Sequence, residues 1–153
     1  MALSKENVEK RMEVFAEACR RQGVKATHQR MEIYRELART EEHPDAETLY
    51  GRVRKRIPSI SLDTVYRALR LFEERGVISR VGSTRERTRF DANTTRHHHF
   101  VCTRCGLVGD FYCAELDHFP PPAEVGAMGR VDSVYVELRG FCRTCQQKRR
   151  KAG

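Results

Sequence analysis

The residues with the clearest chemical potential lie between His97 and Gly106, where the chain reads HHHFVCTRCG. Two cysteines of this stretch have the spacing C-x-x-C, and Cys142 and Cys145 repeat that spacing near the C-terminus. A C-x-x-C turn presents two sulfurs on one knuckle, and two such turns complete a tetrahedral metal site. In a reducing cytosol this pattern is more typical of zinc than of its competing interpretation, a pair of disulfide bonds.

The two cysteine pairs therefore predict a structural Zn²⁺ site. Its four thiolates would leave no open coordination position, so the zinc would contribute to folding. Catalysis would require an open position and a nearby general base, and no substrate cleft is signalled, so we expect no enzyme activity. Cys19 and Cys113 are expected in the apolar core. The predicted zinc ligands are Cys102, Cys105, Cys142 and Cys145.

The histidines predict a second site of different character. If residues 97–102 form a strand, His97 and His99 share one face and His98 points to the other. Nearby carboxylates and a histidine in the N-terminal half add oxygen and nitrogen donors, which suit Fe²⁺ or Mn²⁺ better than a soft metal. The alternative is a group of exposed histidines that binds no metal. The candidate regulatory ligands are His43, Asp91, His97, His99 and Asp110.

The N-terminal half must position part of this second site, and its pattern is helical. Apolar residues recur at helical spacing in four segments up to Gly76. The segments VISRV and RTRF around GSTRE then predict a small hairpin. This order is that of a winged helix-turn-helix. The expected helix N-caps are Ser4, Thr27, Asp45 and Ser61, and the expected helix ends are Gly23, Pro58 and Gly76.

Charge favours a nucleic-acid partner for this half. The net charge is +8, and residues 1–90 carry 20 Lys and Arg against 14 Asp and Glu. Basic residues on the exposed side of the fourth helix could reach base edges or phosphates, although a merely solvated Arg-rich face is the alternative. The candidate DNA contacts are Thr64, Tyr66, Arg67 and Arg70 on this helix, and Arg85 and Arg87 in the wing.

The C-terminal part reads as a small second domain, giving an α+β protein. We expect a DNA-binding domain over 1–90, a polar hinge over 91–96 and a metal-binding domain over 97–153. Three strands are expected at HHHFVC, LVGDFY and SVYVELRGFC, and the proline run between the last two permits only short helices. No apolar run approaches the ~20 residues of a membrane span, and the N-terminus lacks a signal-peptide core, so a cytoplasmic location is expected.

The order of these motifs resembles the ferric uptake regulator (Fur) family of bacterial metalloregulators. The resemblance covers nearly the whole chain, with THQR replacing the more usual TPQR. The matching motifs are THQR at 27–30, EHPDAETLY at 42–50, SLDTVYRALRLFEERGVI at 61–78, RFD at 89–91, HHHFVCTRCG at 97–106 and GFCRTC at 140–145.

The resemblance implies a homodimer in which each winged helix binds half of a palindromic operator in double-stranded DNA. A small α/β dimerisation domain would carry the structural zinc, and regulatory Fe²⁺ or Mn²⁺ would favour DNA binding. Asp110 is similar to the aspartate of the peroxide-sensing subgroup (PerR), whereas iron-sensing members usually carry Glu there. The resemblance thus implies a repressor in which hydrogen peroxide oxidises a ligand histidine of bound Fe²⁺, with His43 and His97 as the oxidation-sensitive residues.

Two alternative functions remain for the same residues. The protein could respond to the level of iron or manganese itself, with metal occupancy as the signal. It could also be a DNA-binding repressor that uses zinc only structurally and leaves the regulatory site vacant. Arg96, which places a positive charge beside His97, favours the second alternative.

Overall fold

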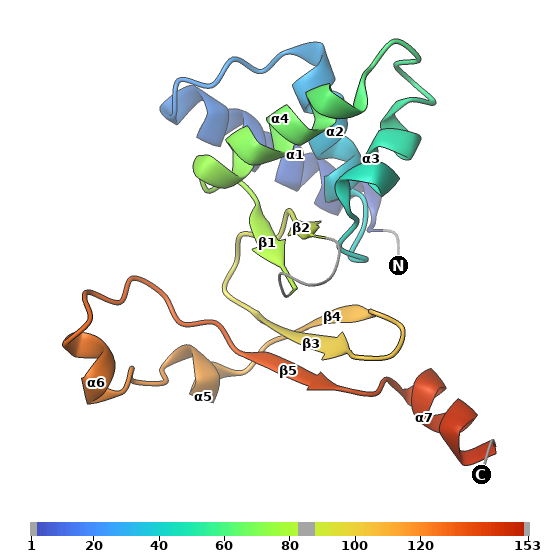
Figure 1. The fold of residues 1–153 in the computed structure, drawn as a ribbon. Coiled ribbons are helices and arrows are strands. Elements are labelled where there is room, and N and C mark those ends of the chain that lie inside the picture. Colours follow the sequence, from blue (N-terminus) through green and yellow to red (C-terminus); the bar gives the residue numbers. More distant parts are fainter. Residues whose placement is uncertain (1–2, 83–87, 152–153) are drawn as a thin grey trace. The chain divides into compact units, whose positions relative to one another are not determined.

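The computed structural model describes residues 3–82 and 88–151 and divides the chain into two compact units (Figure 1). The first unit spans Met1–Thr94 and the second spans Thr95–Gly153. Arg85 and Arg87, two of the predicted wing contacts, lie outside the described residues. Among the described residues, no helix has the length and apolar character needed to cross a membrane.

Four helices and a two-stranded wing form the first unit. The helices are α1 (Lys5–Arg21), α2 (His28–Ala38), α3 (Ala46–Val53) and α4 (Leu62–Glu74). The wing pairs β1 (Ser79–Val81) with β2 (Arg89–Asp91) in antiparallel register. This order of elements is the winged helix-turn-helix that the sequence predicts.

The predicted N-caps are confirmed at all four helices. The side chains of Ser4, Thr27, Asp45 and Ser61 each accept a hydrogen bond from the backbone N–H three residues later, which satisfies one of the N–H groups that a helix start leaves unpaired. Gly23 and Gly76 follow the ends of α1 and α4 with φ of 65° and 68°. Glycine adopts this left-handed conformation without steric strain because it has no Cβ atom.

The predicted end of the third helix at Pro58 is wrong. Helix α3 ends at Val53, whose carbonyl then accepts the N–H of both Arg56 and Ile57 in a tight turn. Arg56 in this turn pairs with buried Glu32, at 3.3 Å between Nη1 and Oε2. A buried carboxylate requires such a partner, and the sequence pattern contains no sign of it.

An aromatic cluster holds the first unit together. The ring of Phe15 on α1 stacks on Tyr34 of α2 with 3.9 Å between the centroids, and meets Phe72 of α4 edge-on at 4.9 Å. All three rings are buried, together with Cys19, which confirms its expected place in the core. Burial and aromatic packing of this kind join three helices that are distant in sequence.

The second unit is built on a three-stranded sheet with β3 in the middle. Its order is β4 (Val108–Phe111), β3 (His98–Cys102), β5 (Glu137–Gly140), with β4 antiparallel and β5 parallel to β3. The segment between β4 and β5 holds only single-turn helices, as predicted from its prolines. These are α5 (Ala114–Asp117) and α6 (Ala123–Gly126), and the chain then ends in α7 (Arg143–Lys151).

Two expectations for this unit need correction. The strand predicted at 133–142 is shorter, because β5 spans only Glu137–Gly140, and its Leu138 is 49% exposed. Cys113 is half-buried at the start of α5 and does not belong to the hydrophobic core. Both corrections have one physical cause, because a three-stranded sheet with single-turn helices offers little apolar volume to cover its residues.

Removal of the Phe15 ring tests the aromatic cluster. Phe15→Ala should lower the free energy of unfolding of the helical unit by about 3–5 kcal/mol, because it leaves a cavity between three helices. Urea denaturation followed by far-ultraviolet circular dichroism measures this change. Val14 on the same helix is 55% exposed, so Val14→Ala is the matched control and should change the free energy by less than about 0.5 kcal/mol. Equal effects of the two substitutions would contradict the packing.

Candidate metal centres and nucleic-acid interface

The register of β3 with its two neighbours positions both groups of potential ligands in the second unit. His99 lies opposite Asp110 in the pairing with β4, and Cys102 lies opposite Gly140 in the pairing with β5. The N–H of Thr103 also donates to the carbonyl of Gly140 over 2.8 Å. The first pairing brings a carboxylate beside a histidine, and the second brings the Cys142 turn beside the end of β3.

The four predicted zinc ligands form one cluster. Their Sγ atoms all lie within 4.8 Å of one another, and those of Cys105 and Cys142 are 3.7 Å apart. The six cysteines, all of them among the described residues, form no disulfide bond. The first knuckle closes through Gly106, whose N–H donates to the Cys102 carbonyl at 2.9 Å and whose φ is 71°.

The surroundings of these sulfurs suit a bound cation. The Cys102 Sγ accepts the backbone N–H of Cys142 at 3.4 Å, and N–H donation from Cys142 and Cys105 lowers the pKa of the Cys102 thiol to about 6. Burial, followed by the neighbouring thiol of Cys142, raises the pKa of Cys145 to about 12. A buried thiol of this kind loses its proton only when a metal ion supplies the compensating charge. Four sulfurs in a closed cluster fit tetrahedral Zn²⁺.

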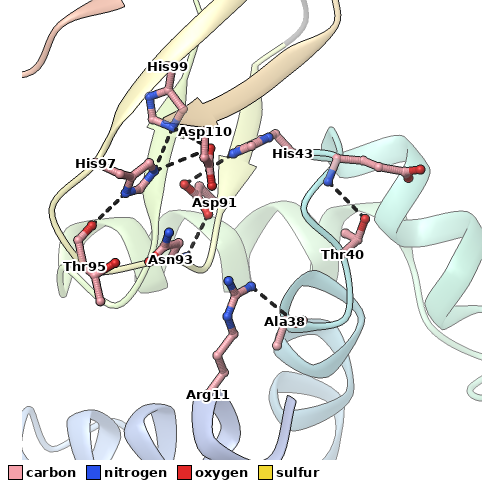
Figure 2. Close-up of polar contacts among 11 residues, drawn as sticks. Arg11, Ala38, Thr40, His43, Asp91, Asn93, Thr95, His97, His99 and Asp110 are labelled. Atoms are coloured by element: carbon pink, nitrogen blue, oxygen red, sulfur yellow. Dashed lines mark hydrogen bonds and ion pairs between the residues drawn. The ribbon is translucent and has the colours of Figure 1, made fainter. Parts of the chain in front are cut away.

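Two histidines and an aspartate form a second group in this unit (Figure 2). The Nε2 atoms of His97 and His99 face each other at 2.9 Å, and Asp110 Oδ1 lies 3.7 Å from the first and 3.4 Å from the second. His97 Nδ1 lies 2.7 Å from the carbonyl oxygen of Thr95. A carbonyl can only accept, so this contact places the proton on Nδ1 and leaves the lone pair on Nε2.

The face assignment for the three histidines follows the prediction. His97 immediately precedes β3, and its ring packs edge-on against His99 at 4.6 Å between centroids. His98 points to the other face, where it is fully buried with its ring 5.4 Å from that of Phe111. The result is a donor set of two imidazole nitrogens and one carboxylate.

The first unit holds the two remaining candidate ligands. His43 Nε2 lies 3.4 Å from Asp91 Oδ2 (Figure 2). The backbone N–H of Phe90 donates to the Pro44 carbonyl at 3.1 Å, which fixes the His43 loop to β2, the strand that ends with Asp91. His43 has a φ of 53°, a left-handed conformation that is uncommon outside glycine and that turns its side chain within a tight loop.

The candidate DNA contacts lie on one side of α4. The side chains of Arg67 and Arg70 are 80% and 81% exposed, and Tyr66 is also exposed. Thr64 is only half-buried and its hydroxyl lies 2.8 Å from that of Ser61, so it serves the helix cap as well. The two arginines also pair with acidic residues of their own helix, Asp63 at 2.8 Å and Glu74 at 3.3 Å.

Sequence reasoning missed one basic residue near this face. Arg80 of β1 lines a groove of about 420 Å³ that also includes Arg67, Arg70 and Thr88. Its guanidinium lies 2.8 Å from Glu73 on α4. The sequence could have indicated Arg80, because it is the one charged residue of the segment VISRV that predicts the first wing strand. A duplex in this groove would meet guanidinium groups from both the helix and the wing.

A partner of His98 was missed as well. Its Nε2 lies 3.1 Å from Asp117 Oδ1 at the end of α5, and the same oxygen lies 3.5 Å from Arg96 Nε. Nothing in the local sequence signals this arrangement, because α5 is separated from β3 by a hairpin. The contact matters for Arg96, whose charge beside His97 is thereby paired with a carboxylate.

Comparisons with known proteins agree with this architecture. A model of the ferric uptake regulator family matches residues 21–124. The peroxide-responsive repressor PerR of Staphylococcus aureus is 32% identical over 148 residues, which are 97% of this chain and all of that one.

Two solved structures are similar in both sequence and fold. The peroxide stress regulator of Campylobacter jejuni has a TM-score of 0.67 and 31% identity, covering 85% of this chain and 98% of that one. A zinc-bound manganese uptake regulator has a TM-score of 0.62 and 32% identity, covering 83% and 97% of the two chains. The family match extends over more than half of the chain and includes helices α2, α3 and α4, the three histidines at 97–99 and the first C-x-x-C pair. The chain therefore belongs to the ferric uptake regulator family.

Proposed function

We propose that this protein is a metal-dependent transcriptional repressor that releases its operator when hydrogen peroxide oxidises a ligand histidine of bound Fe²⁺. The observation that carries the proposal is the donor set of the second unit, in which His97 and His99 turn their Nε2 atoms toward each other beside Asp110. Its family consists of transcriptional regulators, so the protein is a regulator and not an enzyme. We place its activity in the cytoplasm, where the operator is found.

The regulatory ion would draw ligands from both units. His43 and Asp91 of the first unit and His97, His99 and Asp110 of the second supply three nitrogens and two carboxylates. Neither group alone offers a complete coordination sphere, so a shared ion would favour one arrangement of the DNA-binding unit. Nitrogen and oxygen donors suit Fe²⁺ and Mn²⁺. The hinge over 91–96 that the sequence predicts would allow this adjustment.

When bound, Fe²⁺ would donate one electron to split hydrogen peroxide, so that one peroxide oxygen could be added to a ligand imidazole and the other could leave as water. The contribution of the chain is to hold those imidazoles in place. The Thr95 carbonyl fixes the His97 ring through Nδ1, and the contact of Phe90 with Pro44 fixes the His43 loop. Oxidation of His43 or His97 would remove a nitrogen donor, which would weaken metal binding and no longer favour the DNA-binding arrangement.

The four-cysteine cluster would hold Zn²⁺ as a permanent structural element of the second unit. This unit also exposes large apolar side chains, which a homodimer interface in this unit would cover. Tyr135 is 67% exposed, Met128 is 84% exposed and Leu138 is 49% exposed. A twofold dimer would present two α4 helices to the two halves of a palindromic operator.

A second candidate is a regulator that responds to manganese or iron levels directly. The same nitrogen and oxygen donors favour it, as does the similarity to a manganese uptake regulator described above. In this case metal occupancy alone would control DNA binding and the histidines would not be oxidised.

Peroxide treatment distinguishes the two candidates. Protein loaded with Fe²⁺ should lose operator binding after one equivalent of hydrogen peroxide, and peptide mass spectrometry should find one added oxygen on His43 or His97. The Mn²⁺-loaded protein is the control and should keep both its DNA binding and its mass, because Mn²⁺ does not transfer electrons to peroxide under these conditions. Unchanged operator affinity of the Fe²⁺ form, with no oxidised histidine, would reject the peroxide mechanism in favour of metal sensing.

Loss of one cysteine ligand tests the zinc site. Cys102→Ser should reduce zinc from one ion per chain to none and lower the Tm by more than roughly 10 °C, because the metal contributes several kcal/mol to folding. Cys113→Ser is the matched control, since Cys113 lies outside the cluster. Metal analysis and differential scanning fluorimetry provide the two readouts. Full zinc occupancy in Cys102→Ser would argue against a four-thiolate site.

Neutralising the basic face of α4 tests the DNA interface. The operator duplex is first recovered by selection from random sequence. Arg67→Ala or Arg70→Ala should weaken binding to this duplex by about 1–3 kcal/mol, because each variant loses a base or phosphate contact. Fluorescence anisotropy at fixed ionic strength measures the Kd. Arg130 is an equally exposed arginine of the second unit, and Arg130→Ala should leave the Kd unchanged. If all three variants bound equally well, α4 would not be the recognition helix.

A further inference from the structure

His98 is anchored on the face of β3 opposite to the candidate ligands. Its side chain is 0% exposed, and its Nδ1 accepts the backbone N–H of Val136 at 3.3 Å. An imidazole nitrogen that accepts a hydrogen bond carries no proton, so the proton of the neutral ring lies on Nε2. That Nε2 lies 3.1 Å from Asp117 Oδ1. This distance is that of an ion pair but the contact lacks hydrogen-bond geometry, so the ring is hydrogen-bonded toward β5 and lies against the end of α5.

The same carboxylate oxygen also faces a permanent positive charge. Arg96 Nε lies 3.5 Å from Asp117 Oδ1, and Arg96 immediately precedes His97. A guanidinium keeps its charge at any pH that the folded protein experiences. Side chains 96 and 98 thus converge on one carboxylate, while side chains 97 and 99 turn to the other face of the strand.

We propose that Asp117 is a positioning residue for the regulatory metal site. It neutralises the charge of Arg96 and holds this side chain away from His97, so that a cation can bind at the residue next to an arginine. This inference rests on the proposed regulatory site at His97, His99 and Asp110, and it adds a function for α5 that concerns only residues of the second unit.

The physical reason is like-charge repulsion. An unpaired guanidinium on the residue next to a metal ligand would raise the free energy of the bound Mn²⁺ or Fe²⁺, because like charges repel and a partly buried site screens them less than bulk water does. Paired with Asp117, the guanidinium contributes little net charge. The side chain of Asp117 is 27% exposed and that of Arg96 is 49% exposed, so solvent screens the pair only in part.

Direct metal binding by Asp117 is the competing explanation. Among the residues that the structure describes, the two groups of three or more potential ligands do not include Asp117. His98 and Asp117 offer only two donor atoms, and the third group near them is the guanidinium of Arg96, which repels a metal ion. A charge pair therefore accounts for the contacts better than a third metal site.

Charge-neutralising variants of zinc-loaded protein test the proposal, with Mn²⁺ as the probe. Asp117→Asn keeps the shape of the side chain but removes its charge. Its Mn²⁺ affinity, measured by the disappearance of the free-ion signal in electron paramagnetic resonance, should fall about tenfold, the size of effect seen when groups around metal ligands are altered. Arg96→Met should bind Mn²⁺ at least as tightly as the unaltered protein.

The double variant Arg96→Met/Asp117→Asn provides the discriminating result. It should recover most of the affinity lost in Asp117→Asn, because it removes the charge that Asp117 neutralises. A purely structural role of Asp117 predicts no such recovery. Asp132→Asn is the matched control, since Asp132 pairs with Arg130 at 2.8 Å on an exposed surface. Zinc content and Tm verify that each variant is folded.

Different results would contradict the role of Asp117 and the proposed regulatory site. Unchanged Mn²⁺ affinity in Asp117→Asn, or a double variant as weak as the single one, would overturn the role of Asp117. So would the loss of a second bound Mn²⁺ in Asp117→Asn, since Asp117 would then be a ligand itself. If the unaltered, zinc-loaded protein binds no Mn²⁺ at all, that result rejects the proposed regulatory site itself and not only the role of Asp117.

Discussion

The pairing register of β3 is the constraint on which the rest of the second unit depends. One neighbour sets Asp110 opposite His99, and the other sets Gly140 opposite Cys102. Because side chains alternate along a strand, a slip of one residue would turn His97 and His99 to the face of His98 and would separate the two cysteine turns. A single short strand thus positions both a closed thiolate cluster and an adjustable nitrogen and oxygen donor set.

The two sites differ because their surroundings differ. The sulfur cluster is held by backbone N–H groups and by the turns at Gly106 and Cys142, which favours a permanent tetrahedral ion. The histidine group has a fixed tautomer at His97 and offers two nitrogens and one carboxylate, which alone do not complete a coordination sphere. A rigid site on the strand can therefore support a conditional site, and that division of roles suits a regulator.

Much of this organisation follows from local sequence. Helix caps, glycine ends and the alternation of His97, His98 and His99 are decided by neighbouring residues, so patterns predict them correctly. The membership of Cys102 and Cys142 in one cluster also follows from spacing. Asp117 could not be predicted, because its contacts with His98 and Arg96 depend on how the chain returns after β4. The early end of α3 was missed for a similar reason, since the ion pair of Arg56 with Glu32 joins the turn after α3 to α2.

The most direct test of the account is a titration of zinc-loaded protein with Mn²⁺, with metal binding and operator binding followed in the same samples. The account predicts one Mn²⁺ per chain in addition to one zinc, with operator affinity rising in step with Mn²⁺ occupancy. Full operator affinity in protein that contains only zinc would contradict it, because the histidine and aspartate residues would then have no regulatory role.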